Sequence, residues 1–126
     1  MKLLLDTNAL LWWCGDDARL GKNARKMIKD ASDVFVSVVS AWEIVIKSRL
    51  GRLQPIDDFL AAIESGAFVK LPLDFSHIDE YDSLPMHHRD PFDRMLVAQA
   101  RSENLPLLTS DKMLKNYSVS FLDARK

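Results

Sequence analysis

Four acidic residues occupy positions in the sequence at which carboxylates could hold a metal ion. Asp6 and Asp111 each follow an apolar run that is typical of a strand, while Glu43 and Asp93 lie near the starts of two helical patterns. Carboxylates that gather at one place repel one another, so some of them take up protons unless a cation neutralises them. Oxygen ligands without a neighbouring cysteine favour Mg²⁺ or Mn²⁺ over zinc. The four residues therefore predict a divalent-metal site, provided that the fold brings them together.

Glu43 and Asp93 also stand on helical faces that are otherwise apolar. Residues three or four positions apart share one face of a helix. The apolar neighbours are Val39, Ile46 and Leu50 for Glu43, and Leu96, Val97 and Ala100 for Asp93. A carboxylate on such a face is partly removed from water, which is costly unless it is paired or bound to a metal. This placement favours a functional role over a solvated surface charge.

Helix capping is the alternative interpretation for these acids. Asp6 and Asp111 could accept backbone N–H groups at the start of a helix, which is a common use of aspartate. Asp90 could cap the helix that Pro91 begins, and Asp93 would then be a favourable charge in its first turn. Capping explains each residue singly, whereas four acids at one place favour the metal site.

The elements that must position these acids alternate between strand-like and helical patterns, which predicts an α/β domain with a parallel sheet. Strands are predicted over 2–5, 33–36, 68–71, 105–109 and 118–122. Helices are predicted over 9–13, 20–30, 38–49, 56–64, 76–83 and 91–103, with a single turn over 111–115. Ser37 is a suitable N-cap for the third helix, and a more plausible start than a capping box between Ser40 and Glu43. Helix N-termini and strand C-termini meet at the same edge of such a sheet, so the four acids should gather there.

Length and composition limit the class of protein. A chain of 126 residues fits one domain, and 48% hydrophobic with 28% charged residues is ordinary for a globular protein. The net charge of -1 gives no general basic field, so RNA binding would need a local patch or bound metal. The single Cys14 excludes an intrachain disulfide, and Asp6 interrupts the initial apolar run too early for a signal peptide. No stretch approaches the roughly 18 apolar residues that span a bilayer, so we expect a cytoplasmic protein without a membrane partner.

Four short segments surround the acidic residues, namely LLDTN at 4–8, SAWEI at 40–44, HHRDPFDR at 87–94 and LTSD at 108–111. Together they resemble the PIN-domain family, and specifically toxins of the VapC type. The resemblance covers essentially the whole chain, and the run HHRDPFDRMLVAQA is typical of one PIN subfamily. Many of those relatives carry histidine where Asn8 stands, a difference that lies outside the four acids.

The resemblance implies a compact α/β/α sandwich around a mainly parallel five-strand sheet, as a single PIN domain over residues 1–126. It implies that Asp6, Glu43, Asp93 and Asp111 form a catalytic acidic quartet that binds Mg²⁺ or Mn²⁺. It further implies an endoribonuclease that leaves 5′-phosphate and 3′-hydroxyl ends and acts as the toxin of a type II toxin–antitoxin pair. Such proteins cleave RNA, are usually homodimers and are silenced by a cognate antitoxin.

Residues beside the quartet are candidates for substrate binding. Arg94 adjoins the predicted site and is a better candidate for guiding an RNA phosphate than the basic segment 47–52. Thr7 and Ser110 each adjoin a quartet aspartate and could hydrogen-bond a carboxylate or the substrate, or serve as turn hydroxyls. Trp42 could stack on a base, but its place on an apolar helix favours the core.

Asp90, His87 and His88 stand just before the helix predicted at 91–103. Asp90 lies beside a quartet position and not on it, so we interpret it as a helix cap or as a support for the metal ligands. His87 and His88 could contact phosphate or assist proton transfer. A polar loop is also a normal place for solvated histidines, and we favour that interpretation for both.

The chemistry that these residues predict is metal-assisted hydrolysis of a phosphodiester, in which bound cations lower the pKa of a water molecule. Glu43, on its apolar face, is the candidate for orienting or deprotonating that water. An aspartyl-phosphate enzyme is one rival, but no second aspartate stands two residues after Asp6. A non-catalytic nucleic-acid-binding regulatory module with a PIN-like fold is another, although clustered negative charge facing phosphate disfavours it.

Overall fold

A computed structural model describes residues 1–53 and 59–126. The strands within these residues are β1 (Lys2–Leu5), β2 (Asp33–Ser37), β3 (Phe68–Leu71), β4 (Leu107–Thr109) and β5 (Phe121–Asp123). The helices are α1 (Thr7–Cys14), α2 (Lys22–Asp30), α3 (Val38–Arg49), α4 (Phe59–Ser65), α5 (Phe75–Ser83), α6 (Pro91–Glu103) and a short 3₁₀ helix, η1 (Lys112–Asn116). The strands form one sheet in the order β3-β2-β1-β4-β5, with every pair parallel. The predicted α/β class with a parallel sheet is confirmed.

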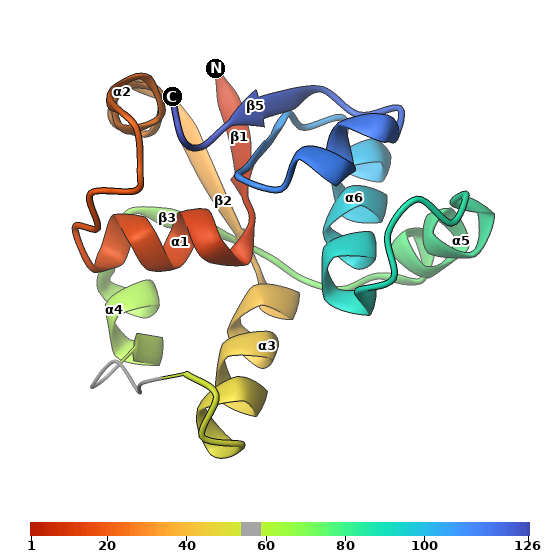
Figure 1. Cartoon of the computed structure of the whole chain (residues 1–126), viewed down its shortest axis with the longest axis horizontal. Coiled ribbons are helices and arrows are strands. Elements are labelled where there is room, and N and C mark those ends of the chain that lie inside the picture. Colours follow the sequence, from red (N-terminus) through yellow and green to blue (C-terminus); the bar gives the residue numbers. More distant parts are fainter. Residues whose placement is uncertain (54–58) are drawn as a thin grey trace.

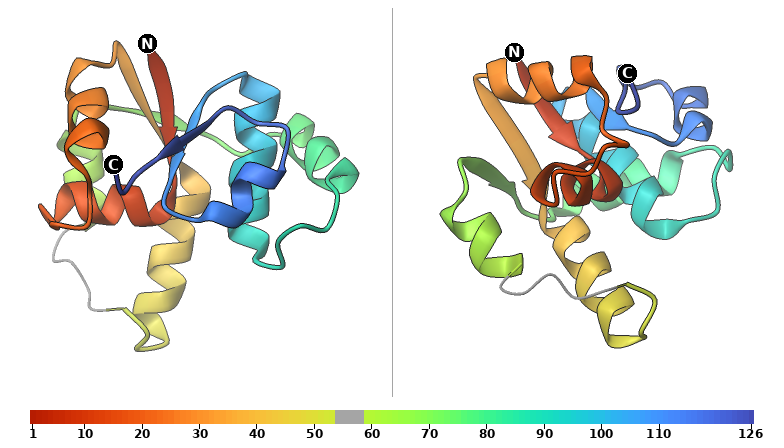
Figure 2. Two further views of the ribbon diagram at one scale, coloured as in Figure 1. Left: turned by 45° about the horizontal axis from the view of Figure 1, so that its top comes forward. Right: turned by 60° about the vertical axis from the view of Figure 1, so that its left-hand side comes forward.

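Helices cover both faces of the sheet, as Figures 1 and 2 show. One core cluster joins the sheet to α1, α2 and α4, through side chains such as Leu3, Leu10 and Ile63. The second cluster joins the opposite face to α6 and η1, through side chains such as Leu4 and Leu96. Leu3 and Leu4 are both fully buried in different clusters, because successive side chains of a strand point to opposite faces. The predicted α/β/α sandwich is therefore confirmed.

The two helices that carry Glu43 and Asp93 begin where the sequence predicts. At the start of α3, Ser37 Oγ accepts the backbone N–H of Val39 at 3.0 Å. At the start of α6, the Asp90 carboxylate accepts the N–H groups of Phe92 and Asp93 at 2.8 and 3.2 Å, with proline at the first helical position. These caps satisfy donors that have no partner inside the helix. The predicted bounds of both helices, and the capping role of Asp90, are confirmed.

The strand predicted over 105–109 begins two residues later than expected. The N–H of Leu105 donates to the carbonyl of Ala100 at 2.8 Å and so closes the end of α6. Pro106 has no N–H to donate to a neighbouring strand. Pairing with β1 and β5 therefore starts only at Leu107.

The bounds of β5 and α4 also differ from those predicted. β5 spans Phe121–Asp123 instead of 118–122, since Phe121 is the partner of Leu107 in β4. The predicted start of the helix over 56–64 lies outside the described residues, and the structure describes α4 over Phe59–Ser65. None of the helices in the described ranges has the length and apolar character needed to cross a membrane.

Trp42 lies on the outer face of α3, so the prediction that it belongs to the core was wrong. It is 58% exposed, and its ring packs edge-on against Phe92 with centroids 5.4 Å apart. Successive side chains of a helix point roughly 100° apart. Because the side chain of Glu43 points into the protein, that of Trp42 points toward solvent. The face of α3 that is buried carries Val39, Ser40, Glu43 and Ile44.

Candidate active site

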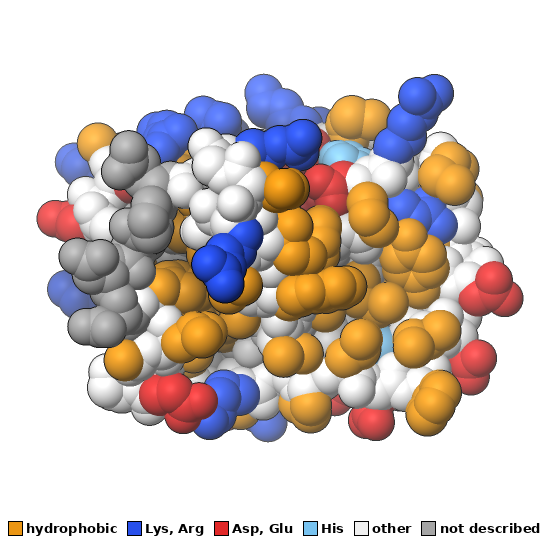
Figure 3. All heavy atoms as spheres, turned by 90° about the horizontal axis from the view of Figure 1, so that it is seen from below, with side chains coloured by type: hydrophobic (Ala, Val, Ile, Leu, Met, Phe, Trp, Pro, Cys, Tyr) orange, Lys and Arg blue, Asp and Glu red, His pale blue; other side chains and the backbone are white. Residues whose placement is uncertain are grey.

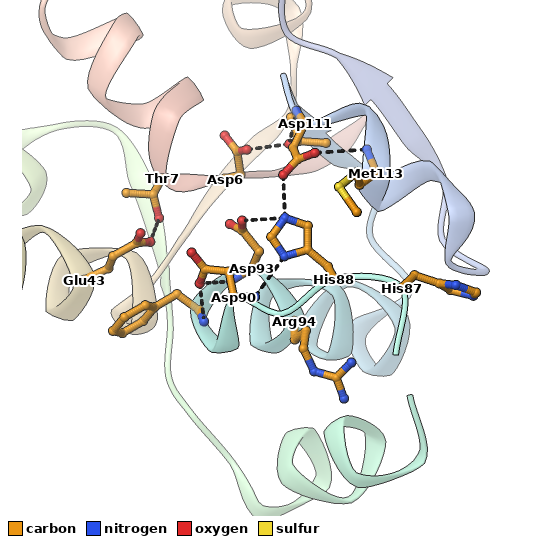
Figure 4. A network of polar contacts seen from close by, with 12 residues as sticks. Asp6, Thr7, Glu43, His87, His88, Asp90, Asp93, Arg94, Asp111 and Met113 are labelled. Atoms are coloured by element: carbon orange, nitrogen blue, oxygen red, sulfur yellow. Dashed lines mark hydrogen bonds and ion pairs between the residues drawn. The ribbon is translucent and has the colours of Figure 1, made fainter. Parts of the chain in front are cut away.

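The structure brings the four acidic side chains to one edge of the sheet (Figure 4). Asp6 follows β1 and is the N-cap of α1, and Asp111 follows β4 and is the N-cap of η1. Asp93 stands in the first turn of α6, and Glu43 lies in the second turn of α3. This is the edge where β1 and β4 end and where α3 and α6 begin, because strands and helices run in opposite directions. Asp6 and Asp111 thus cap helices and also contribute to the acidic cluster.

Asp6 is buried, and its carboxylate has only neutral donors among the described residues. It is 3% exposed. Its Oδ1 accepts the N–H of Ala9 at 2.7 Å, and its Oδ2 accepts the hydroxyl of Thr109. The pKa of Asp6 is raised to about 6, mainly by burial and to a smaller extent by the charges of Glu43 and Asp111. The two hydrogen bonds act in the opposite direction. A cation beside Asp6 would relieve this cost.

Asp93 is also difficult to ionise. Burial is the main cause that raises its pKa to about 7, and the carboxylates of Asp90, Asp6 and Glu43 add to it. Since the charge of Asp6 raises the pKa of Asp93, the two carboxyls lie within one cluster of negative charge.

Glu43 is as buried as Asp6, at 3% exposed, but it has a cationic partner. Lys47 Nζ donates to its Oε2 at 2.5 Å, and Thr7 Oγ1 donates to its Oε1 at 2.6 Å. The hydrogen bond to Glu43 is also the main reason that the pKa of Lys47 is raised. Thr7 therefore reaches the cluster, as the sequence led us to expect, but it contacts Glu43 and not its neighbour Asp6.

The hydroxyl that reaches Asp6 comes from Thr109. Thr109 precedes Ser110, which the sequence offered as a possible partner of a carboxylate or the substrate, or as a turn hydroxyl. Thr109 is the last residue of β4 and is fully buried, whereas Ser110 is partly exposed. Thr109 Oγ1 also accepts the N–H of Asp111 at 3.0 Å. It therefore links two aspartates of the cluster, a role that the alternation of side chains along β4 could have suggested.

Arg94 does not reach the carboxylates, which corrects our prediction that it lies beside the site to guide phosphate. It is 5% exposed, and its Nη1 donates to the carbonyl of Pro85 at 3.0 Å and to the Tyr117 hydroxyl at 3.2 Å. Its guanidinium also lies over the ring of Tyr81. Figure 4 shows the side chain pointing away from the cluster, because the residue after Asp93 faces another side of α6.

His88 is part of the cluster, so the interpretation of this residue as a solvated histidine was wrong. Its Nε2 lies 2.7 Å from Asp111 Oδ2 and 3.5 Å from Asp93 Oδ2, and its side chain is 14% exposed. These three residues are close enough together to hold a metal ion. His87, by contrast, is exposed and packs edge-on against Tyr117.

The residues of the cluster fit a divalent cation. Their donor atoms are mainly carboxylate oxygens, the ligands that Mg²⁺ and Mn²⁺ prefer. The raised pKa values of Asp6 and Asp93, at about 6 and about 7, reflect buried negative charge without enough positive charge nearby. A bound cation would supply that charge and favour the ionised carboxylates.

The fold is that of a PIN domain. Residues 3–119 match the model of the PIN domain family, so the chain belongs to this family. Within it, the chain resembles proteins of the VapC type. Ribonuclease VapC22 of Mycobacterium tuberculosis is 24% identical, and the alignment covers 91% of both chains.

Solved structures share the same fold. A DNA-bound VapBC from Salmonella typhimurium has a TM-score of 0.74 at 16% identity, and VapBC2 from Rickettsia felis, bound to a promoter DNA fragment, has a TM-score of 0.73 at 14% identity. Both similarities cover 98% of each chain. A toxin–antitoxin complex from Klebsiella pneumoniae matches with a TM-score of 0.66 at 15% identity over 97% of each chain.

Proposed function

We propose that this PIN-domain protein is a metal-dependent endoribonuclease and the toxin of a type II toxin–antitoxin pair. The observation that carries the proposal is the buried acidic cluster, in which the pKa values of Asp6 and Asp93 are raised to about 6 and about 7. Proteins of one fold carry out many different functions, so the residues of the site indicate the function better than the fold does. The name of the relative VapC22, a ribonuclease, supports RNA as the substrate.

Asp6, Glu43, Asp93 and Asp111 are the residues that would hold Mg²⁺ or Mn²⁺. A bound divalent cation lowers the pKa of a coordinated water and stabilises charge on a reacting phosphate. Asp90 supports these metal ligands indirectly, because it caps α6 and so fixes the position of Asp93. Its negative charge also raises the pKa of Asp93. The proposed products carry 5′-phosphate and 3′-hydroxyl ends.

Glu43 is the residue that we propose to orient the attacking water. Both of its carboxylate oxygens are held, one by Thr7 and one by Lys47, so the side chain has a fixed direction. A fixed carboxylate can accept a proton of water without first reorganising. Thr7 is thereby a support for Glu43 more than a substrate contact, and Ser110 remains the candidate hydroxyl for substrate.

An antitoxin is the protein partner that we propose. Figure 3 shows hydrophobic side chains gathered on the face seen from below. A groove of about 660 Å³ lies between α3, α4 and the end of β3, lined mainly by apolar residues that include Val38, Ala41, Leu60, Ile63, Leu71 and Leu73. Exposed apolar surface of this kind marks sites of protein interaction. Pairing with a second copy, as a homodimer, and a cytoplasmic location complete the proposal.

Cleavage of RNA tests the proposal. Purified protein is incubated with total RNA in Mg²⁺, in Mn²⁺ or in chelator, and the cut sites are mapped. We expect defined cuts with either cation and none in chelator. RNA that is bound but not cut under every condition would favour the non-catalytic binding module instead.

Growth of cells tests the cellular role. Expression of the wild-type chain alone should arrest growth, and Asp93→Asn at an equal protein level should be harmless. A small protein encoded beside it should restore growth. Toxicity that persists in Asp93→Asn would show that hydrolysis is not its cause.

A further inference from the structure

His88 lies between two of the carboxylates that we propose as metal ligands. Its Nε2 faces Asp111 at 2.7 Å and Asp93 at 3.5 Å. Figure 4 shows the ring between η1 and the start of α6, with its two nitrogens facing different partners. A histidine in this place could bind the metal itself, or it could donate a hydrogen bond to a residue that does.

The second nitrogen of the ring decides between these two roles. His88 Nδ1 accepts the backbone N–H of Asp90 at 3.0 Å. A ring nitrogen that accepts a hydrogen bond carries no proton, so the proton of the neutral imidazole is on Nε2. Nε2 therefore donates to Asp111, and a protonated nitrogen has no lone pair for a metal.

The Asp111 carboxylate is consequently held at both oxygens. Its Oδ1 accepts the N–H of Met113 at 3.0 Å, and its Oδ2 accepts Nε2–H of His88 at 2.7 Å. Each carboxylate oxygen can accept more than one partner, so both remain able to contact a cation. Hydrogen bonds of this kind orient the groups that bind a metal.

We infer that His88 is a positioning residue that donates from Nε2 to Asp111 and orients this carboxylate, without binding the metal ion itself. The inference rests on the proposed function in that Asp111 is taken as a metal ligand. The imidazole ring of His88 connects Asp90 at the N-terminus of α6 to Asp111 at the start of η1. The loop before α6 thereby acts on the geometry of the site, through a side chain that belongs to neither helix.

The tautomer is tested in the metal-free wild-type protein at neutral pH. Long-range ¹H–¹⁵N correlation spectra of the imidazole rings report which nitrogen carries the proton. We expect it on Nε2 of His88, both before and after the addition of Mg²⁺. A proton on Nδ1 would overturn the inference, because Nε2 would then be free to bind the ion.

Mn²⁺ affinity, measured by calorimetric titration, separates the two roles. His88→Ala should weaken binding about tenfold, and His88→Gln should stay within about threefold of the wild type, because its amide can also donate to Asp111. His87→Gln is the matched control and should bind as the wild type does, since His87 is exposed and contacts the Tyr117 ring.

Three results of the Mn²⁺ titrations would also overturn the inference. Equal losses in His88→Gln and His88→Ala would show that a ring nitrogen binds the ion. Wild-type affinity in His88→Ala, or no Mn²⁺ binding by the wild-type protein, would show that His88 positions no ligand. If the wild-type protein binds Mn²⁺ in the expected pattern but cleaves no RNA, the proposed function fails and the assignment of His88 stands.

Discussion

Asp6 and Glu43 are equally buried, at 3% exposed each, but their carboxylates differ in the charge of their hydrogen-bond partners. Glu43 is paired with a cation of the chain, since Lys47 Nζ lies 2.5 Å from its Oε2. The hydrogen-bond donors to Asp6 in the described part of the chain are neutral, namely Thr109 and Ala9. The pKa of Asp6 is raised to about 6 as a result of burial. The free-energy cost of burying the Glu43 carboxylate is thus offset by Lys47. The cost of burying the Asp6 carboxylate would be offset only by a bound cation.

Asp93 belongs with Asp6 in this comparison. Its pKa is raised to about 7 by burial and by the surrounding carboxylates of Asp90, Asp6 and Glu43. The site therefore has a self-compensated part, formed by Glu43 and Lys47, and an uncompensated part around Asp6 and Asp93. The uncompensated part is where we expect a metal ion to bind most strongly.

The largest effect is expected when the uncompensated part loses a carboxylate. Asp93→Asn should lower the rate of RNA cleavage by more than about a hundredfold, the upper range for residues that only support a metal ligand. Asp90→Ser is the matched control, because serine also caps a helix well, and it should stay within about tenfold of wild type. Both rates are measured on one labelled RNA at equal protein concentration. Equal losses would make Asp90 a functional acid and our interpretation of it as a cap incomplete.

The pH dependence of the free energy of unfolding depends on the same unpaired carboxylates, Asp6 and Asp93. With a raised pKa, the native state holds a proton that the unfolded chain releases, so the free energy of unfolding in chelator should fall as pH rises from about 4 to about 7. The pKa of Asp93 is raised from 3.8 to about 7, and this shift changes the free energy of unfolding by up to about 4 kcal/mol over the pH range. Denaturant unfolding at several pH values checks this, and Asp93→Asn should flatten the decline. A metal-free protein whose stability rises over this range would contradict the raised pKa.

Removing the internal cation should make Glu43 behave like Asp6. Lys47→Met should lower the free energy of unfolding in chelator by about 2 kcal/mol at neutral pH, because it leaves a buried carboxylate unpaired; the partial exposure of Lys47 limits the loss. Mn²⁺ should then stabilise the variant more than it stabilises the wild type. Chemical denaturation with and without Mn²⁺ measures both effects. No gain from Mn²⁺ over the wild type would mean that Glu43 lies outside the metal site.

The smallest effect is expected at the neutral donor to Asp6. Thr109→Val keeps the shape of the side chain but removes the hydroxyl that Asp6 accepts. The free energy of unfolding should fall by about 1 kcal/mol, the usual net value of one hydrogen bond. The same denaturation assay measures it, and Ser110→Ala is the control, expected to change stability less. A larger loss in Ser110→Ala would show that the wrong hydroxyl has been assigned.

The sequence could predict the convergence of the acids because local patterns place each of them. Asp6 follows a strand, Asp93 follows the Asp90 cap, and helix N-termini share an edge with strand C-termini. Glu43 was placed by the cap that begins its helix at Ser37. Each of these signals lies within a few residues of the acid concerned.

The contacts that the sequence could not predict join distant residues. Thr109 reaches Asp6 across 103 positions, and His88 reaches Asp111 across 23 positions. Arg94 is adjacent to Asp93 in sequence, but the turn of the helix directs it to Tyr117 and Pro85 instead. Adjacency along the chain is therefore a poor guide to which polar side chain supports a buried acid.

The melting temperature of the protein with and without Mn²⁺ shows most directly whether the carboxylates of Asp6 and Asp93 bind a divalent cation. A ligand that binds only the native state raises this temperature. We predict a clear increase for the wild type, and little or none for Asp6→Asn and Asp93→Asn, both of which should be at least as stable as the wild type in chelator because a buried repulsion is removed. An unchanged increase in both variants would show that Asp6 and Asp93 do not bind the cation.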